Sequence, residues 1–71
     1  MSGSVYRVTE VIGTSPDSWA QAAANAVETA ARSVRDLRVA EATRFDVTIK
    51  DGKVAEYRVR LDISFKYEAG D

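Results

Sequence analysis

Basic side chains are the residues of this sequence whose type and spacing best suit chemistry with a ligand. Near the end of the chain, Arg58, Arg60 and Lys66 lie an even number of positions apart, as on one face of a strand. Arg7 lies in an earlier segment that also alternates. Such groups on one strand face could bind the phosphates of a ligand. The same spacing fits a solvated or salt-bridged face of a sheet equally well, so both interpretations stay open.

The usual catalytic groups are missing. The sequence contains no His and no Cys, which removes the common general base, the thiol nucleophile and most zinc ligands. Carboxylates could in principle do acid and base work, but those within alternating strand patterns are solvated by default. These are Glu10, Glu41, Glu56 and Asp62. We therefore expect a binding or structural protein and not an enzyme.

Gly13 and Trp19 each admit a functional and a structural interpretation. A glycine before a helix can help to cradle a phosphate, but a single glycine more simply permits a turn. Trp19 could offer its indole ring to a planar ligand. In the first helical turn, however, we expect its apolar bulk to pack on the sheet as part of the core.

The charge balance is nearly even, with ten basic and eleven acidic residues and a net charge of −1. No overall field therefore favours a nucleic acid or an anionic membrane as partner. Residues 1–4 lack the apolar core of a signal peptide, and no stretch approaches the roughly 18 apolar residues of a membrane span. We expect a cytoplasmic protein with neither kind of partner.

The pattern of apolar residues predicts a strand followed by a helix in the first half of the chain. Residues 5–12 alternate with period two, and Gly13 is expected to end this strand. Ser15 is expected to cap a helix of roughly 20 residues, with Pro16 in its first turn. The apolar stripe of the helix, which should face the sheet, comprises Trp19, Ala23, Ala26, Ala30, Val34 and Leu37.

Two long strands are predicted after the helix. Residues 39–50 alternate, which places Val39 on the face opposite to Asp46 and Thr48. Asp51-Gly52 then predicts a type I′ turn into an antiparallel strand. The core face of this last strand is expected to comprise Ala55, Tyr57, Val59, Leu61, Ile63, Phe65 and Tyr67.

The length of the chain supports a single domain over residues 1–71. A domain of this size buries only about 60% of its unfolded surface. Because disulfides are impossible, we expect self-association to stabilise it. The predicted strands are also longer than the single helix, so the helix leaves a sheet edge and some apolar surface uncovered. Identical copies could cover both in a closed, symmetric assembly.

Five short motifs occur in a characteristic order along the chain. They read GTSP at 13–16, LRVAE at 37–41, DGKV at 51–54, EYRV at 56–59 and FK at 65–66. Their order and spacing resemble the dodecin family over residues 5–68. The resemblance implies an α+β fold of βαββ order, in which a three-stranded antiparallel sheet wraps around one helix. It also implies that twelve copies form a hollow homododecamer.

The resemblance further implies a protein that binds or stores small ligands. In flavin-binding dodecins a Trp after the helix stacks on the flavin ring and a Gln in the last strand hydrogen-bonds it, near a two-fold axis. The matching positions here are Val39 and Arg58, and Asp46 and Thr48 line up with the rest of that pocket. Without the aromatic stacking surface, we expect flavin to bind weakly or not at all.

Calcium and coenzyme A are the other ligands that the resemblance suggests. The sequence is more similar to a Trp-less branch described as calcium dodecins, which gives a calcium-binding shell as the alternative function. Calcium needs six to eight oxygen ligands, and the sequence leaves them unassigned. Some dodecins bind coenzyme A near a three-fold interface, where the corresponding Arg7, Arg35 and Lys66 are basic here and could bind phosphates.

Overall fold

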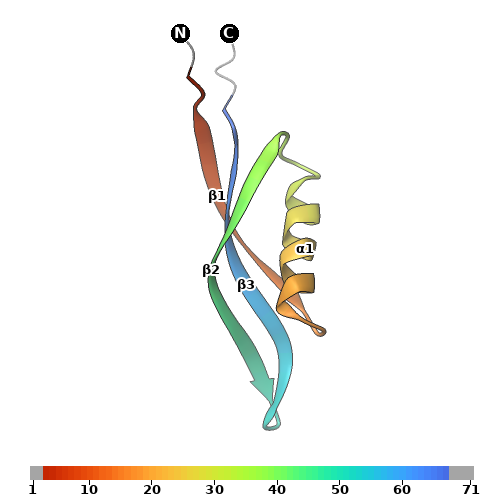
Figure 1. The fold of residues 1–71 in the computed structure, drawn as a ribbon. Coiled ribbons are helices and arrows are strands. Elements are labelled where there is room, and N and C mark those ends of the chain that lie inside the picture. The colour runs from red at the N-terminus through yellow and green to blue at the C-terminus, as the bar shows by residue number, and fades with distance from the viewer. Residues whose placement is uncertain (1–2, 68–71) are drawn as a thin grey trace.

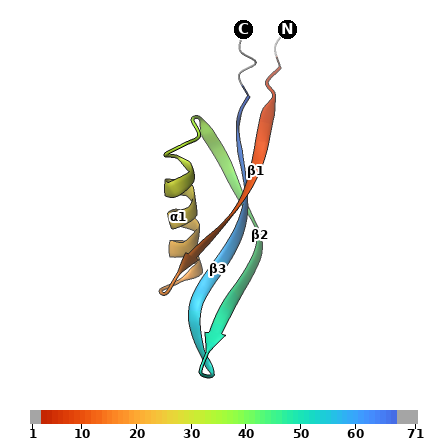
Figure 2. The same ribbon diagram turned by 180° about the vertical axis from the view of Figure 1, so that it is seen from behind.

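The computed structural model describes residues 3–67 and has four elements in the predicted order. They are β1 (Tyr6–Ser15), α1 (Trp19–Ala30), β2 (Leu37–Lys50) and β3 (Lys53–Lys66). The strands form one antiparallel sheet in the order β1-β3-β2, so β3 is central. The helix lies along one face of the sheet, and the β2–β3 hairpin extends past its first turn (Figures 1 and 2). The predicted βαββ fold is confirmed.

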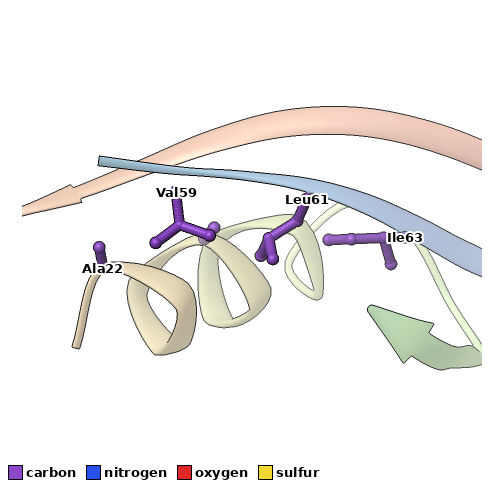
Figure 3. Packing of buried hydrophobic residues seen from close by; sticks show 5 residues of the cluster. Ala22, Val59, Leu61 and Ile63 are labelled. Carbon is purple, nitrogen blue, oxygen red and sulfur yellow. The ribbon is translucent and has the colours of Figure 1, made fainter. Parts of the chain in front are cut away.

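The core lies between α1 and the middle of β3. Val59, Leu61 and Ile63 are at most 2% exposed and pack against Ala22 and Ala26 of the helix (Figure 3). The small alanine side chains let the helix approach the sheet closely. Burying each large aliphatic side chain contributes about 1.5–3 kcal/mol. The predicted core face of the last strand is therefore confirmed at its centre.

Gly13 lies within β1 and does not end it, contrary to the prediction. The strand continues to Ser15. A Cβ atom on Gly13 would clash with the Ala22 carbonyl oxygen and lie 2.8 Å from the Ala26 Cβ. The glycine therefore permits the close approach of helix and strand, and not a turn.

The helix begins later than predicted, because Ser18 and not Ser15 is the N-cap. The Ser18 hydroxyl accepts a hydrogen bond from the Gln21 N–H at 3.0 Å, and Ser-x-x-Gln has the spacing of a capping box. Ser15 is buried, and its hydroxyl instead accepts a hydrogen bond from the Asp17 N–H at 2.9 Å. Pro16 thus precedes the helix and does not occupy its first turn.

The helix also ends earlier than predicted, after 12 residues at Ala30. Turns follow, and Asp36, in the left-handed region with φ of 59°, leads the chain into β2. The buried side of α1 is centred on Ala22, which the predicted stripe omitted, and Ala26. Among residues 3–67 no helix has the length and apolar content needed to cross a membrane.

The β2–β3 hairpin turns as predicted. Asp51 and Gly52 have φ values of 53° and 75°, the positive values that a type I′ turn requires. The two strands then pair antiparallel along their whole lengths.

The alternation predicted for β2 is wrong because the register with β3 shifts between Ala42 and Arg44. This β-bulge offsets the alternation by one residue. As a result Val39, Asp46 and Thr48 share one face of the sheet, the face away from α1. We call this the outer face; it comprises Val8, Glu10, Ile12, Thr14, Val39, Glu41, Arg44, Asp46, Thr48, Glu56, Arg58, Arg60, Asp62 and Ser64.

Candidate functional site

Asp46 and Arg58 pair across β2 and β3 on the outer face. The Arg58 guanidinium donates from Nε to Oδ1 at 2.8 Å and from Nη2 to Oδ2 at 3.0 Å. Such a two-point fork is among the stronger polar contacts. The hydrogen bond from Arg58 lowers the pKa of the Asp46 carboxyl and raises the pKa of Arg58 itself. Both groups are therefore charged at neutral pH.

Val39 lies far from this pair within one subunit. It pairs with Ser64, six residues along β3 from Arg58, which at about 3.3 Å per residue is roughly 20 Å. Thr48 lies next to the Asp46–Arg58 pair along the outer face, opposite Glu56. The fold thus brings together three of the four predicted flavin-pocket positions, and Val39 could join them only from another copy.

Arg7, Arg35 and Lys66 line a single cavity of about 730 Å³. They come from β1, from the connection after α1 and from the end of β3. The Arg7 guanidinium lies 5.4 Å from the centroid of the Tyr67 ring, a cation–π contact. The Lys66 backbone N–H donates to the Asp36 carbonyl at 3.3 Å. The first contact positions the Arg7 guanidinium, and the three basic residues line the cavity together with the acidic Asp36.

The four basic residues Arg7, Arg58, Arg60 and Lys66 do not form one surface. Arg58 is held in its fork, and Arg60 Nε lies 3.9 Å from Glu10 Oε2 on the outer face. Arg7 and Lys66 instead line the cavity. The salt-bridged interpretation therefore describes Arg58 and Arg60, whereas the geometry suited to a ligand belongs to Arg7 and Lys66.

An aromatic cluster at the start of α1 was missed by sequence reasoning. The Trp19 ring meets Phe45 and Tyr57 edge-on, with centroids 6.0 and 5.1 Å apart. Its Nε1 donates to the Asp46 carbonyl at 3.0 Å. Trp19 packs on the sheet as predicted, but it is 40% exposed, so its assignment to the buried core was wrong. The sequence alone did not indicate this cluster, because the bulge between Ala42 and Arg44 is what places Phe45 on the helix side of the sheet.

The carboxylates of one subunit do not fit a calcium ion. Glu10, Asp62 and Glu41 occupy neighbouring positions across the three strands. Within residues 3–67, however, no group of three or more His, Cys, Asp or Glu side chains could hold a metal ion. Calcium needs six to eight oxygen ligands, so a site would require oxygens from elsewhere.

These features describe a small βαββ domain. The helix covers one face of its sheet, and the other face is exposed. The family model for dodecins matches residues 5–68. A calcium dodecin from Mycobacterium tuberculosis is 49% identical over 63 residues, which cover 89% of each chain. This chain therefore belongs to the dodecin family, as its motifs predicted.

Solved structures of dodecins have the same fold. The dodecin from Streptomyces coelicolor superposes with a TM-score of 0.92 at 46% identity, over 99% of this chain and 100% of that chain. A structure from M. tuberculosis, described as a calcium dodecin with a novel calcium-binding site, gives a TM-score of 0.81 at 47% identity, over 94% and 96% of the two chains. The similarity extends over nearly the whole described subunit.

Proposed function

We propose that this chain is the subunit of a homododecameric shell that binds or stores a small ligand and catalyses no reaction. The ligand we favour carries phosphate groups, as coenzyme A does, and binds in the cavity lined by Arg7, Arg35 and Lys66. The observation that carries this proposal is that three basic residues from separate segments line one cavity. Such groups form charge-assisted hydrogen bonds with phosphate oxygens.

Self-assembly is supported by apolar surface that one subunit leaves uncovered. Val8 and Val39 on the outer face are 63% and 62% exposed. The two valines flank Ser64 of β3, so both edge strands expose apolar surface that a partner can bury. Further copies would cover these side chains and complete pockets that one subunit lacks.

Calorimetric titration with coenzyme A tests the ligand. We expect binding to weaken as the salt concentration rises and to fall about tenfold or more when Arg7→Gln and Arg35→Gln are combined, because each lost charge-assisted bond is worth about 1.5–3 kcal/mol. Lys50→Gln with Lys53→Gln is the matched control, since both lysines are exposed at the hairpin. Equal binding by wild type and both variants would contradict the proposed site.

Flavins are expected to bind poorly, because Val39 and Arg58 offer no aromatic surface for stacking. In a fluorescence titration, riboflavin or FMN should show little quenching by the wild-type protein. Tight quenching would overturn this part of the proposal.

Calcium is the second candidate ligand, and the identity with a relative called calcium dodecin favours it. Because the carboxylates of one subunit do not converge, its ligands would come from more than one copy. Calorimetry with calcium on chelator-treated protein tests this alternative, together with melting curves with and without chelator. Absence of binding heat and an unchanged melting temperature would rule it out.

A further inference from the structure

Arg7 and Tyr67 are diagonal neighbours on one face of the sheet. Arg7 pairs with Phe65 across β1 and β3. The Tyr67 N–H donates to the Val5 carbonyl at 2.8 Å, which carries this pairing one residue past the end of β3. Side chains two residues apart on a strand lie on the same face, and a diagonal neighbour across the ladder is within reach of an aromatic ring. The register therefore places the Tyr67 ring beside the Arg7 guanidinium.

The contact with Tyr67 holds Arg7 without occupying its hydrogen-bond donors. The guanidinium carbon lies 5.4 Å from the ring centroid, and a cation–π contact acts through the face of the ring. A guanidinium carries five N–H donors. Within residues 3–67, neither the ion pairs nor the side-chain hydrogen bonds involve Arg7. These donors are therefore available to a ligand in the cavity, which Arg7 and Tyr67 both line.

Two other arginines of the sheet are held differently. Arg58 gives two of its donors to the Asp46 carboxylate, and Arg60 Nε lies 3.9 Å from Glu10 Oε2. A carboxylate partner fixes an arginine, but it also compensates the charge and takes up donors. An aromatic ring restricts the side chain and leaves both the charge and the donors for an anion. Arg7 is thus the arginine of the three whose surroundings suit the binding of a phosphate group.

We propose that Tyr67 is a positioning residue of the phosphate site, whose ring holds the Arg7 guanidinium at the cavity before a ligand arrives. Immobilising a flexible side chain costs free energy on binding, and a side chain that is already restricted loses less. The ring therefore raises the affinity for a phosphate group through Arg7, without bonding to that group itself. The inference rests on the proposed function, because it concerns the same cavity.

A double-mutant cycle in coenzyme A binding tests this coupling. Tyr67→Leu removes the ring and should weaken binding about two- to fivefold, the factor that an exposed cation–π contact supplies. Arg7→Gln removes the guanidinium itself and should weaken binding more. In the Arg7→Gln background, Tyr67→Leu should have almost no further effect, because the ring then has no cation to position. Calorimetric titration of the full-length wild type and the three variants measures the four affinities.

The salt dependence of binding gives a second readout. Attraction between the Arg7 guanidinium and a phosphate group is screened by salt. Tyr67→Leu removes no basic group, yet it should flatten the fall of affinity with salt, as Arg7→Gln does. A purely structural defect would lower the affinity by the same factor at every salt concentration, and that result would contradict the positioning role.

Three further variants make the result specific. Tyr67→Phe keeps the ring face and should bind as wild type does, which shows that the ring and not the hydroxyl is required. Tyr6→Leu removes a tyrosine of similar exposure, 46% against 44% for Tyr67, that does not line the cavity, and should also bind as wild type does. Melting curves report whether each variant is folded. Tyr67→Ile, whose branched side chain suits a strand, repeats the test if Tyr67→Leu melts early.

The outcomes separate this inference from the proposed function. If Tyr67→Leu weakens binding by the same factor with and without Arg7, the ring contacts the ligand itself and the positioning role is wrong. Unchanged or tighter binding by Tyr67→Leu would also overturn that role, while the phosphate site would stand. A wild-type protein that binds no coenzyme A would remove the site and the positioning role together.

Discussion

The two faces of the sheet use the same central strand in opposite ways. On the helix side, Val59, Leu61 and Ile63 are almost fully buried against α1. On the outer face the intervening residues of β3 are polar or charged and only partly covered, and Val8 and Val39 on the edge strands are exposed. The helix side therefore holds the hydrophobic core, whereas the outer face leaves polar and apolar side chains accessible for the assembly proposed above.

Truncation of a core residue should have the largest effect and show that stability comes from the helix side. Leu61→Ala removes a side chain that is 2% exposed and should lower the free energy of unfolding by about 3 kcal/mol. Val54→Ala, at an exposed position, should lower it by less than about 1 kcal/mol. Urea unfolding curves measure both, and similar losses in the two variants would contradict the division between the faces.

A methyl group at the contact between β1 and α1 should have the next largest effect. Gly13→Ala forces the helix away from the strand, because the new Cβ would clash with the Ala22 carbonyl oxygen. Overpacking of this kind costs about 1–3 kcal/mol. Gly3→Ala is the control, since nothing lies within 4 Å of its Cβ position. Thermal melting should show a lower midpoint for Gly13→Ala alone, and an unchanged midpoint would refute the role given to this glycine.

On the outer face, substitutions should change binding more than folding. Combining Val39→Trp with Arg58→Gln supplies a stacking ring and an amide, and should tighten FMN binding about tenfold, which corresponds to ~1.4 kcal/mol. Arg58→Gln alone lacks the ring and should give little gain. Quenching of flavin fluorescence measures both affinities. No improvement in the double variant would show that these positions do not form one pocket.

The smallest expected effect is on the Asp46–Arg58 fork, which is accessible to solvent. Arg58 lowers the Asp46 pKa from its usual 3.8. A carboxyl with a depressed pKa in the folded state stabilises the protein above its unfolded pKa, and the contribution is lost as the pH falls through the folded pKa. Asp46→Asn should therefore melt slightly below wild type at pH 7, with a difference that shrinks as the pH falls below 3.8. If the difference in melting temperature between Asp46→Asn and wild type stayed constant into strong acid, the ion pair would be excluded as its cause.

The element order and the family could be predicted because their signals are local. Period-two alternation marks β3 clearly, since this central strand has a core on one side only. Asp51-Gly52 fixes the hairpin through the positive φ values that such a turn needs. The motif order along residues 5–68 then led to the family, which the comparisons confirmed.

The errors occurred where local signals depend on tertiary partners. The bulge between Ala42 and Arg44 arises from pairing with β3, and no Gly or Pro in that segment announces it. The role of Gly13 is visible only once α1 packs on β1. Ser15 and Ser18 are both residue types that suit an N-cap. Ser18 is the N-cap in the structure, and Gln21 stands three residues later, as in a capping box.

The candidate site was also predicted only in part, because some of its contacts depend on tertiary packing. The resemblance grouped Arg7, Arg35 and Lys66, and the fold does bring them to one cavity, although their ligand stays a prediction. The aromatic contacts of Trp19 depend on the orientation of Phe45 after the bulge. They could not be read from residue spacing.

The proposed shell depends most on one claim, that further copies cover the outer face. Light scattering on the wild-type protein at micromolar concentration tests that claim most directly. We predict a single species with the mass of twelve 7.8 kDa chains. A folded monomer that persists at the same concentration would contradict the account.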